Sequence, residues 1–288
     1  MQTAGLMAVD LDGTLITDHG RITGKVYSAL ERAVENGWEI VIASGRTFYA
    51  ARQIIEKLPF IRYAVLSNGA CIIKLQDDSI MHMETLESGL AKNVVESIRS
   101  HGAIPALYTT DIMNQRVYYD SLERACTFFK WYVKKDTRCE LVDNVMDYID
   151  DVLQIGMIDE KKTVLAIRDT LKEFDVRVMA LPFESAHFGG KNNDYWFMQT
   201  VHKNATKSNA LRRLAGWIDI PDGRLVAVGD NYNDADMIEN ADIGVAMGNS
   251  PDEIKKLANV IVATNNDSGL SQVVDEVILS GKYFTETY

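Results

Sequence analysis

The sequence predicts an α/β protein in which a Rossmann-like sheet of parallel strands is interrupted by a second, smaller α/β domain. Two observations indicate the sheet. Short, almost continuously apolar segments alternate with segments of helical periodicity near the N-terminus, and they do so again in the C-terminal third. Such strands are typical of a parallel sheet that helices cover on both faces. The insertion is indicated by the middle of the chain, which has helix–strand passages of its own.

The N-terminal part should form a strand, a helix, a second strand, a second helix and a hairpin. Apolar residues recur at helical spacing from Val26 to Val34, and Gly37 can end this helix. An Asn-Gly turn between two apolar runs predicts the hairpin. The strands are expected at 6–10 and 38–44, the second helix up to about residue 57, and the hairpin at 62–74.

The C-terminal third repeats this alternation. Helices are expected at about 206–216, from about 233, as a short segment after 248 and at the end of the chain, with strands at 224–230, 243–248 and 259–264. Because these elements continue the pattern of the N-terminal part, we expect both parts to build one core, made of residues 1–84 and 190–288.

Residues 85–189 are expected to form the inserted α/β domain. Helices are predicted at 87–101, 122–135 and 160–173, and strands at 152–158 and 176–180. The segment 187–194 contains Gly and Lys without the spacing of a phosphate-binding P-loop, and it is therefore predicted to be a linker.

Composition excludes several classes of protein. The net charge of -11 disfavours nucleic acid and anionic membranes as partners. No apolar run approaches the length of about 18 residues that spans a bilayer, and the N-terminus lacks the basic region of a signal peptide. Three widely spaced cysteines without a CxxC motif are typical of reduced thiols. We therefore expect a cytoplasmic protein that is a monomer or a weak homo-oligomer.

Polar residues follow several of the predicted strands. Asp10 and Asp12 end the first strand, Ser44-Gly45-Arg46 end the second, and Asp230 ends the strand at 224–230. Asn233 and Asp234 come shortly afterwards, and Lys207 begins the helix at about 206–216. Because ligands in open parallel sheets bind at the carboxyl ends of the strands, we expect these groups to converge at one edge.

This set of groups suits the transfer of a phosphoryl group. Asp10 and Asp230 can together hold Mg²⁺, a hard cation that prefers oxygen ligands. The metal would remove the repulsion between a carboxylate and a phosphate ester. Lys207 can neutralise further charge, and the Ser44 hydroxyl with nearby backbone N–H groups can orient the phosphate oxygens.

The two acids at the end of the first strand would have different roles in the reaction. Asp10 would attack phosphorus and form an aspartyl-phosphate. Asp12, turned out of the strand by Gly13, would protonate the leaving oxygen and then activate the water that hydrolyses the intermediate.

These segments resemble the four motifs of the haloacid dehalogenase superfamily: "DLDGTL" (10–15), "ASGR" (43–46), Lys207 before a helix, and "GDNYND" (229–234). The position of the insertion resembles that of the Cof-type sugar phosphatases (subclass IIB), as do "SNGA" (67–70) and "GVAMGNS" (244–250).

The resemblance implies a Rossmann-like core with an α/β cap. It also implies Mg²⁺ ligands from Asp10, Asp230 and the backbone carbonyl of Asp12, with Asn233 and Asp234 supporting the metal or the phosphate. Family members often carry Gly directly after the lysine of the third motif. This chain has Ser208 at that position, so the start of the helix is expected to differ locally from that of the family.

The leading interpretation is a Mg²⁺-dependent phosphatase for small phosphorylated metabolites such as sugar phosphates. A phosphomutase with the same core is an alternative, and a module that signals through a phosphorylated aspartate is another. A signalling receiver needs neither an acid at position 12 nor an inserted domain. Two residue assignments stay open: Arg46 binds phosphate or forms a structural ion pair, and Asn68 faces the substrate or only closes a hairpin.

Overall fold

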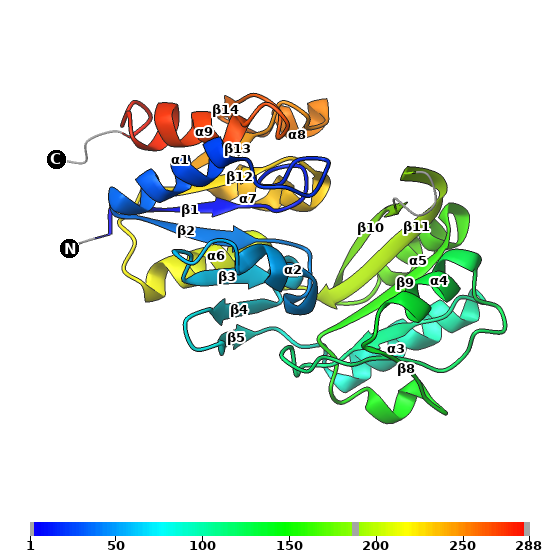
Figure 1. Cartoon of the computed structure of the whole chain (residues 1–288). Helices are drawn as coiled ribbons and strands as arrows, with labels where there is room; N and C mark the ends of the chain where they lie inside the picture. The colour runs from blue at the N-terminus through cyan, green and yellow to red at the C-terminus, as the bar shows by residue number, and fades with distance from the viewer. Residues whose placement is uncertain (1–2, 186–189, 285–288) are drawn as a thin grey trace. The chain divides into compact units, whose positions relative to one another are not determined.

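The computed structural model describes residues 3–185 and 190–284. The chain divides into two compact units (Figure 1). The core unit comprises Met1–His82 and Thr206–Tyr288, and the inserted unit comprises Met83–Ala205.

The core unit is built on one sheet, which within the described residues has eight strands in the order β14-β13-β12-β1-β2-β3-β4-β5. Their bounds are β1 (Gly5–Val9), β2 (Trp38–Ala43), β3 (Tyr63–Leu66), β4 (Cys71–Lys74), β5 (Ser79–Met83), β12 (Leu225–Gly229), β13 (Ile243–Ala246) and β14 (Val260–Ile261). β1 lies in the interior of the sheet, is buried along its whole length and pairs in parallel with both β2 and β12. This burial on both faces explains its unbroken apolar run.

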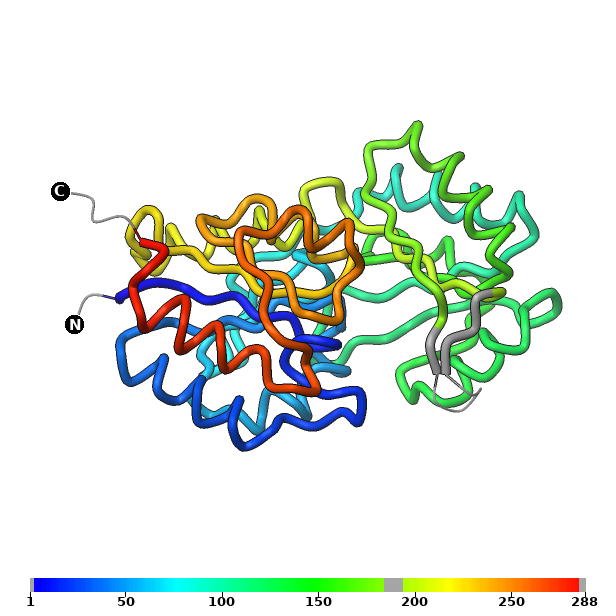
Figure 2. Tube along the Cα trace, turned by 90° about the horizontal axis from the view of Figure 1, so that it is seen from above, coloured from blue at the N-terminus to red at the C-terminus, as the bar shows by residue number. Residues whose placement is uncertain are grey.

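Helices cover both faces of this sheet. They are α1 (Gly24–Glu35), α2 (Phe48–Ile55), α6 (Lys207–Trp217), α7 (Ala235–Asn240), α8 (Asp252–Lys255) and α9 (Gly269–Gln272), which continues into the π-helical segment η5 (Val273–Ile278). One apolar cluster joins side chains of α6, α7 and α8 to one face of the sheet. Figure 2 shows α1 and the C-terminal helices, blue and red, on the opposite side from the yellow and orange α6 and α7.

Local sequence explains where α1 and the hairpin form. The Thr23 hydroxyl caps α1 by accepting a hydrogen bond from the Val26 backbone N–H at 3.2 Å. Gly37 follows the helix with a φ of +83°, which L-residues rarely adopt. The predicted hairpin at 62–74 is confirmed, since β3 and β4 pair antiparallel around the 3₁₀ turn η1 (Ser67–Gly69).

The inserted unit has its own sheet and its own apolar clusters. The described part of this sheet has six strands in the order β10-β11-β9-β6-β7-β8. Its elements are α3 (Ser88–Ser100), β6 (Ala106–Tyr108), β7 (Val117–Tyr119), α4 (Thr127–Lys135), β8 (Cys139–Leu141), η2 (Val145–Tyr148), β9 (Gln154–Glu160), α5 (Lys161–Leu171), β10 (Val176–Ser185) and β11 (Gly190–His202). α3 and α5 contribute to one cluster and α4 to another. A separate core of this kind is what defines a domain.

The C-terminal end of the inserted unit differs from the prediction. The linker predicted at 187–194 is wrong for residues 190–194, which begin β11, while residues 187–189 lie outside the described residues. β11 pairs with both β10 and β9, so backbone hydrogen bonding makes it a strand despite its polar start. The structural division therefore falls after Ala205, whereas the sequence placed it at residue 189.

Other boundaries differ as well: β10 extends to Ser185 where the sequence predicted 176–180, and β14 covers only Val260–Ile261 of the predicted 259–264. α4 begins at Thr127 and not at residue 122, because Cys126 caps it by accepting from the Phe129 backbone N–H at 3.4 Å. Among the described residues, none of the helices combines the length and the apolar character needed to cross a membrane.

Candidate active site

Asp10 lies at the carboxyl end of β1 and is almost completely buried, with 4% of its surface exposed. Its backbone N–H donates to the Val228 carbonyl at 3.0 Å, which continues the pairing of β1 with β12. The chain then turns sharply at Gly13, where φ is +76°. A Cβ atom there would lie 2.3 Å from Asp230 Oδ2, so a side chain would strike the neighbouring carboxylate.

Lys207 is the first residue of α6 and is fully buried. Its Nζ lies 2.7 Å from Asp10 Oδ1 and 2.5 Å from Asp234 Oδ1. The helix entry is orderly despite Ser208, because the Thr206 hydroxyl accepts from the Asn209 backbone N–H at 3.0 Å. One ammonium group therefore joins two carboxylates from distant parts of the chain.

Asp230 follows β12 and faces the turn after β1. The Thr14 hydroxyl donates to Asp230 Oδ1 at 2.9 Å, and Thr14 is itself buried. The Asn249 side-chain amide donates to the Gly13 carbonyl at 2.9 Å and lies 3.4 Å from Asp230 Oδ2. These two residues fix the Asp230 carboxylate, and the motif analysis assigned neither of them. Asn249 lies in the "GVAMGNS" segment and Thr14 lies in "DLDGTL". The sequence therefore indicated the two segments but gave no role to these two residues.

Asp234 is fully buried and both its oxygens are engaged. Oδ1 pairs with Lys207, and Oδ2 accepts from the backbone N–H groups of Asp230 and Asn231, each at 3.0 Å. This carboxylate therefore holds the loop after β12 and orients the ammonium group of Lys207.

The cluster carries an excess of negative charge. Three carboxylates, those of Asp10, Asp230 and Asp234, face one ammonium, which leaves two negative charges in excess. Burial first, and the neighbouring Asp234 carboxylate second, raise the pKa of Asp230 to about 7. Burial and Asp234 also raise the pKa of Asp10 well above its usual range, although Lys207 opposes this. For Lys207, the two carboxylates outweigh burial and raise its pKa, so it stays an ammonium.

These residues fit a divalent cation. Oxygens of Asp10, Asp230 and Asp234 lie within 4.8 Å of one another. A dication would balance the two excess charges, and carboxylate oxygens are the ligands that Mg²⁺ prefers. Because Asp234 is already held by the Lys207 ammonium and by two backbone N–H groups, Asp10 and Asp230 are the two carboxylates suited to hold the metal directly.

Asp12 lies apart from this cluster. Its carboxylate forms a two-point ion pair with Arg46, whose Nε is 2.7 Å from Oδ2 and whose Nη2 is 2.5 Å from Oδ1. The Asp12 side chain is 57% exposed. The guanidinium also donates to the Ala50 carbonyl at 3.1 Å. Asp12 thus faces solvent, in contrast to the buried Asp10 two residues earlier.

Ser44 and Gly45 follow β2 at the same edge of the sheet. Ser44 is 1% exposed, and its hydroxyl accepts from the Arg46 backbone N–H at 3.2 Å. The Asn68 side chain lies against Gly45, and Asn233 Nδ2 donates to Asn68 Oδ1 at 3.4 Å. All nine residues predicted for the site therefore belong to loops or helix starts of the core unit.

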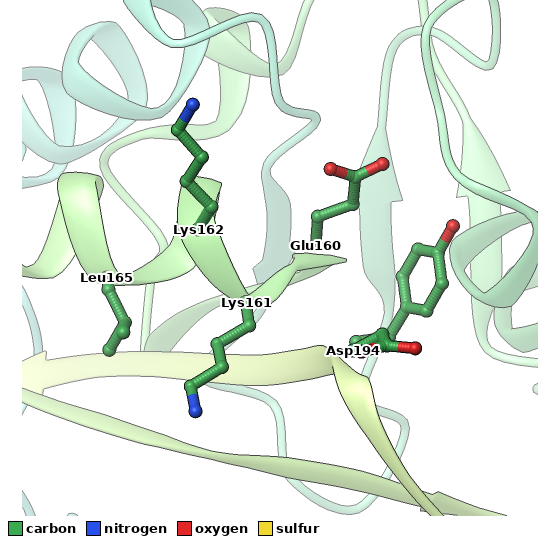
Figure 3. Close-up of a pocket in the computed structure, with 6 residues that line it drawn as sticks. Glu160, Lys161, Lys162, Leu165 and Asp194 are labelled. Carbon is green, nitrogen blue, oxygen red and sulfur yellow. The ribbon is translucent and has the colours of Figure 1, made fainter.

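The inserted unit holds a pocket of about 710 Å³ between α5 and β11 (Figure 3). It is lined by Glu160, Lys161, Lys162, Leu165, Asp194 and Tyr195. Lys161 lies over the Trp196 ring, with Nζ 5.1 Å from its centroid. Figure 3 shows the Lys161 and Lys162 side chains leaving the helix in opposite directions. Their charges do not converge on one point, so this pocket lacks the concentrated charge of the Asp10 cluster.

Comparison with known proteins identifies the family. The profile of the haloacid dehalogenase-like hydrolases matches residues 7–274, which is nearly the whole chain. The chain belongs to the haloacid dehalogenase-like hydrolases. The family predicted from the four motifs is thereby confirmed, and with it the class of enzyme, a hydrolase.

Relatives of this hydrolase include named phosphatases. It is 26% identical to the 5-amino-6-(5-phospho-D-ribitylamino)uracil phosphatase YitU of Bacillus subtilis, over 94% of this chain and 96% of that protein. It is 24% identical to the pyridoxal phosphate phosphatase YbhA of Escherichia coli, over 94% of this chain and 98% of that protein.

A solved structure confirms the α/β fold. The HAD subclass IIB sugar phosphatase BT4131 matches 95% of this chain and 98% of its own, with a TM-score of 0.72 and 19% identity. At this identity the likeness concerns the fold.

Proposed function

We propose that this hydrolase is a Mg²⁺-dependent phosphatase that cleaves phosphate monoesters of small metabolites through a phosphorylated Asp10. The observation that carries the proposal is the buried contact of Lys207 with Asp10 and Asp234, next to Asp230. A buried cluster with two excess negative charges is costly unless a cation compensates it. A site that collects such charge around a nucleophile suits phosphoryl transfer.

Asp10 is placed to act as the nucleophile. Its Oδ1 accepts from Lys207, and within the described residues Oδ2 makes no hydrogen bond, so Oδ2 can attack phosphorus. A bond forms between Oδ2 and phosphorus while the ester P–O bond breaks. Lys207 keeps its positive charge and offsets the negative charge of the transferring group. When bound by Asp10 and Asp230, Mg²⁺ would supply a Lewis acid that lowers the repulsion between carboxylate and phosphate.

Asp12 would move the proton in both half-reactions. In the first, its carboxylic acid gives a proton to the leaving oxygen. In the second, the resulting carboxylate takes a proton from the water that attacks phosphorus, which releases inorganic phosphate and restores Asp10. The exposed position of Asp12 supports this role, because a group that exchanges protons with substrate and water must reach both.

The substrate would be a small phosphorylated metabolite. The two relatives above are named for phosphates of a ribitylaminouracil and of pyridoxal, which are chemically different small molecules. Their common feature is a phosphate monoester, which is the part that Asp10, Lys207 and Ser44 would handle. We further propose that the inserted unit serves as a cap that selects among such substrates, since it has a core of its own.

The test is hydrolysis of p-nitrophenyl phosphate with Mg²⁺, with EDTA, and with the variant Asp10→Asn. We expect the wild-type protein to release inorganic phosphate with Mg²⁺, and we expect no release in EDTA or from Asp10→Asn. Asp252→Asn is the matched control, because it removes an exposed carboxylate outside the cluster, and it should keep full activity. Full activity in EDTA would contradict the metal assignment. Return of the phosphate to a sugar phosphate, without its release to water, would indicate the phosphomutase.

A further inference from the structure

The turn η1 holds three consecutive residues in the left-handed region. Their φ angles are +50° for Ser67, +57° for Asn68 and +98° for Gly69, and all three are buried. A non-glycine residue with positive φ is uncommon, and two in succession inside a protein are more so. Such backbone persists only where the surrounding structure enforces it, and it clusters at functional sites.

Backbone hydrogen bonds tie this turn to the loop after β2. The Asn68 N–H donates to the Ser44 carbonyl at 3.1 Å, and the Ser67 N–H donates to the Arg46 carbonyl at 2.9 Å. The loop that would orient the phosphate oxygens therefore rests on η1. A hairpin that only joined β3 to β4 would not need these contacts.

The same turn contacts the start of α6. A Cβ atom on Gly69 would lie 2.1 Å from the Thr206 carbonyl oxygen and 2.8 Å from the Lys207 backbone nitrogen. The backbone of η1 thus packs directly on the residue that carries the buried ammonium group. A side chain at position 69 would displace the helix start.

The Asn68 side chain completes the contact with a third segment. Its Oδ1 accepts from Asn233 Nδ2 at 3.4 Å. Its amide oxygen and nitrogen lie against Gly45, where a Cβ atom would be 2.9 Å from Oδ1 and 3.0 Å from Nδ2. Asn68 is only 4% exposed, so this amide is a buried polar group placed between two phosphate-binding segments.

We propose that Asn68 is a positioning residue of the phosphate site: it holds the Asn233 amide and the Ser44–Gly45 loop in the arrangement that binds phosphate. The inference rests on the proposed function, since it takes Ser44 and Asn233 as phosphate-binding groups. The left-handed turn brings the Asn68 side chain to this position, so the strained backbone of the turn serves the phosphate site.

Glycine and alanine variants separate the side chain from the turn. Asn68→Gly deletes the amide but adopts positive φ without strain, whereas Asn68→Ala deletes the amide and keeps the strain. We expect Asn68→Gly to keep the Tm of the wild type and to bind inorganic phosphate, in the presence of Mg²⁺, about five-fold more weakly, the worth of a hydrogen bond. Asn68→Ala should show the same loss of binding and a lower Tm. KM should rise similarly, with a smaller change in kcat.

Asp219→Gly is the matched control. Asp219 also has positive φ, at +53°, but it lies in the exposed turn between α6 and β12. Its replacement should leave phosphate binding unchanged. If Asn68→Gly binds phosphate as tightly as this control, Asn68 only closes the hairpin and the proposal is overturned.

A double-mutant cycle tests whether Asn68 acts through Asn233. If it does, the double variant Asn68→Gly, Asn233→Ala should bind phosphate more weakly than the wild type by less than the product of the two single effects. Effects that multiply would overturn the proposed link. Phosphate binding, measured by calorimetry, is independent of turnover. A wild-type protein that binds phosphate but releases none from any ester would therefore contradict the phosphatase while leaving the test of Asn68 intact.

Discussion

Arg46 holds the carboxylate of Asp12 through two parallel contacts, Nε to Oδ2 at 2.7 Å and Nη2 to Oδ1 at 2.5 Å. Of the two alternatives for Arg46, the ion pair is observed, and binding of phosphate stays a prediction. Its partner is the proposed proton carrier. An exposed pair of this kind contributes roughly 0–1 kcal/mol to stability, so its value would lie in orienting Asp12.

The first prediction concerns this orientation. Arg46→Lys keeps the charge but cannot make two parallel contacts, so Asp12 should lose its fixed direction. We expect kcat for an alkyl phosphate to fall about ten-fold, a part of the gain from general acid catalysis. Tm should stay unchanged. The control is Arg52→Lys, because Arg52 makes an exposed ion pair with Glu56 on α2. Equal kcat values for both variants would contradict the orienting role.

The second prediction concerns the metal site. Thr14→Val removes the hydroxyl that donates to Asp230 Oδ1 and keeps the shape of the side chain. Groups that orient a metal ligand are typically worth about ten-fold or more in metal affinity. When the metal-free variant is titrated with Mg²⁺ in a calorimeter, the Kd for Mg²⁺ should therefore be about ten-fold higher than that of the wild-type protein. An unchanged Kd would mean that Asp230 does not bind the metal.

The third prediction is a pH dependence of stability without metal. The pKa of Asp230 is raised from its ordinary value of 3.8 to about 7, chiefly by burial and by Asp234. The folded state therefore keeps a proton that the unfolded state releases between these two values. This contribution is fully present below about pH 4 and is lost as the pH rises through about 7. The raised pKa of Asp10 acts in the same direction.

Thermal unfolding in EDTA tests this dependence. The Tm should fall between about pH 5 and pH 8, and Mg²⁺ should raise the Tm more at pH 8, where it need not displace a proton. Asp230→Asn should flatten both trends. A Mg²⁺ effect that is equal at the two pH values would argue that the metal does not bind to these carboxylates.

The fourth prediction concerns Lys207. Lys207→Met leaves Asp10 and Asp234 buried without their ammonium partner, and loss of one member of a buried ion pair typically costs about 3–5 kcal/mol. Urea unfolding should show a loss of this order, and turnover should disappear. Lys203→Met removes an exposed partner of Asp175 and should change stability little. Similar losses for the two variants would contradict the assigned charge balance.

The core was predictable because its strands are buried on both faces. β1, β2 and β12 read as apolar runs, and their parallel pairing brings Asp10, Ser44 and Asp230 to one edge, as the sequence indicated. The inserted unit was less readable. β6, β7 and β8 have three residues each, which is too short for any period to be visible. β11 begins with polar residues, and its partners β9 and β10 determine its conformation.

Within the site, the sequence predicted which groups meet but not where each side chain points. The backbone carbonyl of Asp12 was expected at the metal, its carboxylate was expected to carry protons, and Asp234 was expected to support the metal or the phosphate. The Asp12 carboxylate pairs with Arg46, and Asp234 is occupied by Lys207 and two backbone N–H groups. Such directions depend on loop conformation and on partners far away in the chain. Asn249 is an example: its segment was marked in the sequence, but its contact with Gly13, 236 residues earlier, was not.

The central claim, a phosphoryl group on Asp10, is tested most directly by trapping that group. Asp12→Asn should still accept phosphate from an ester with a good leaving group, such as p-nitrophenyl phosphate, but should activate water poorly, so the intermediate accumulates. Acid quenching, borohydride reduction and peptide mass spectrometry then locate the acyl phosphate. We predict reduction to homoserine at position 10 in Asp12→Asn and none in the Asp10→Asn, Asp12→Asn double variant. Homoserine at another aspartate, or phosphate release without any trapped protein, would contradict the account.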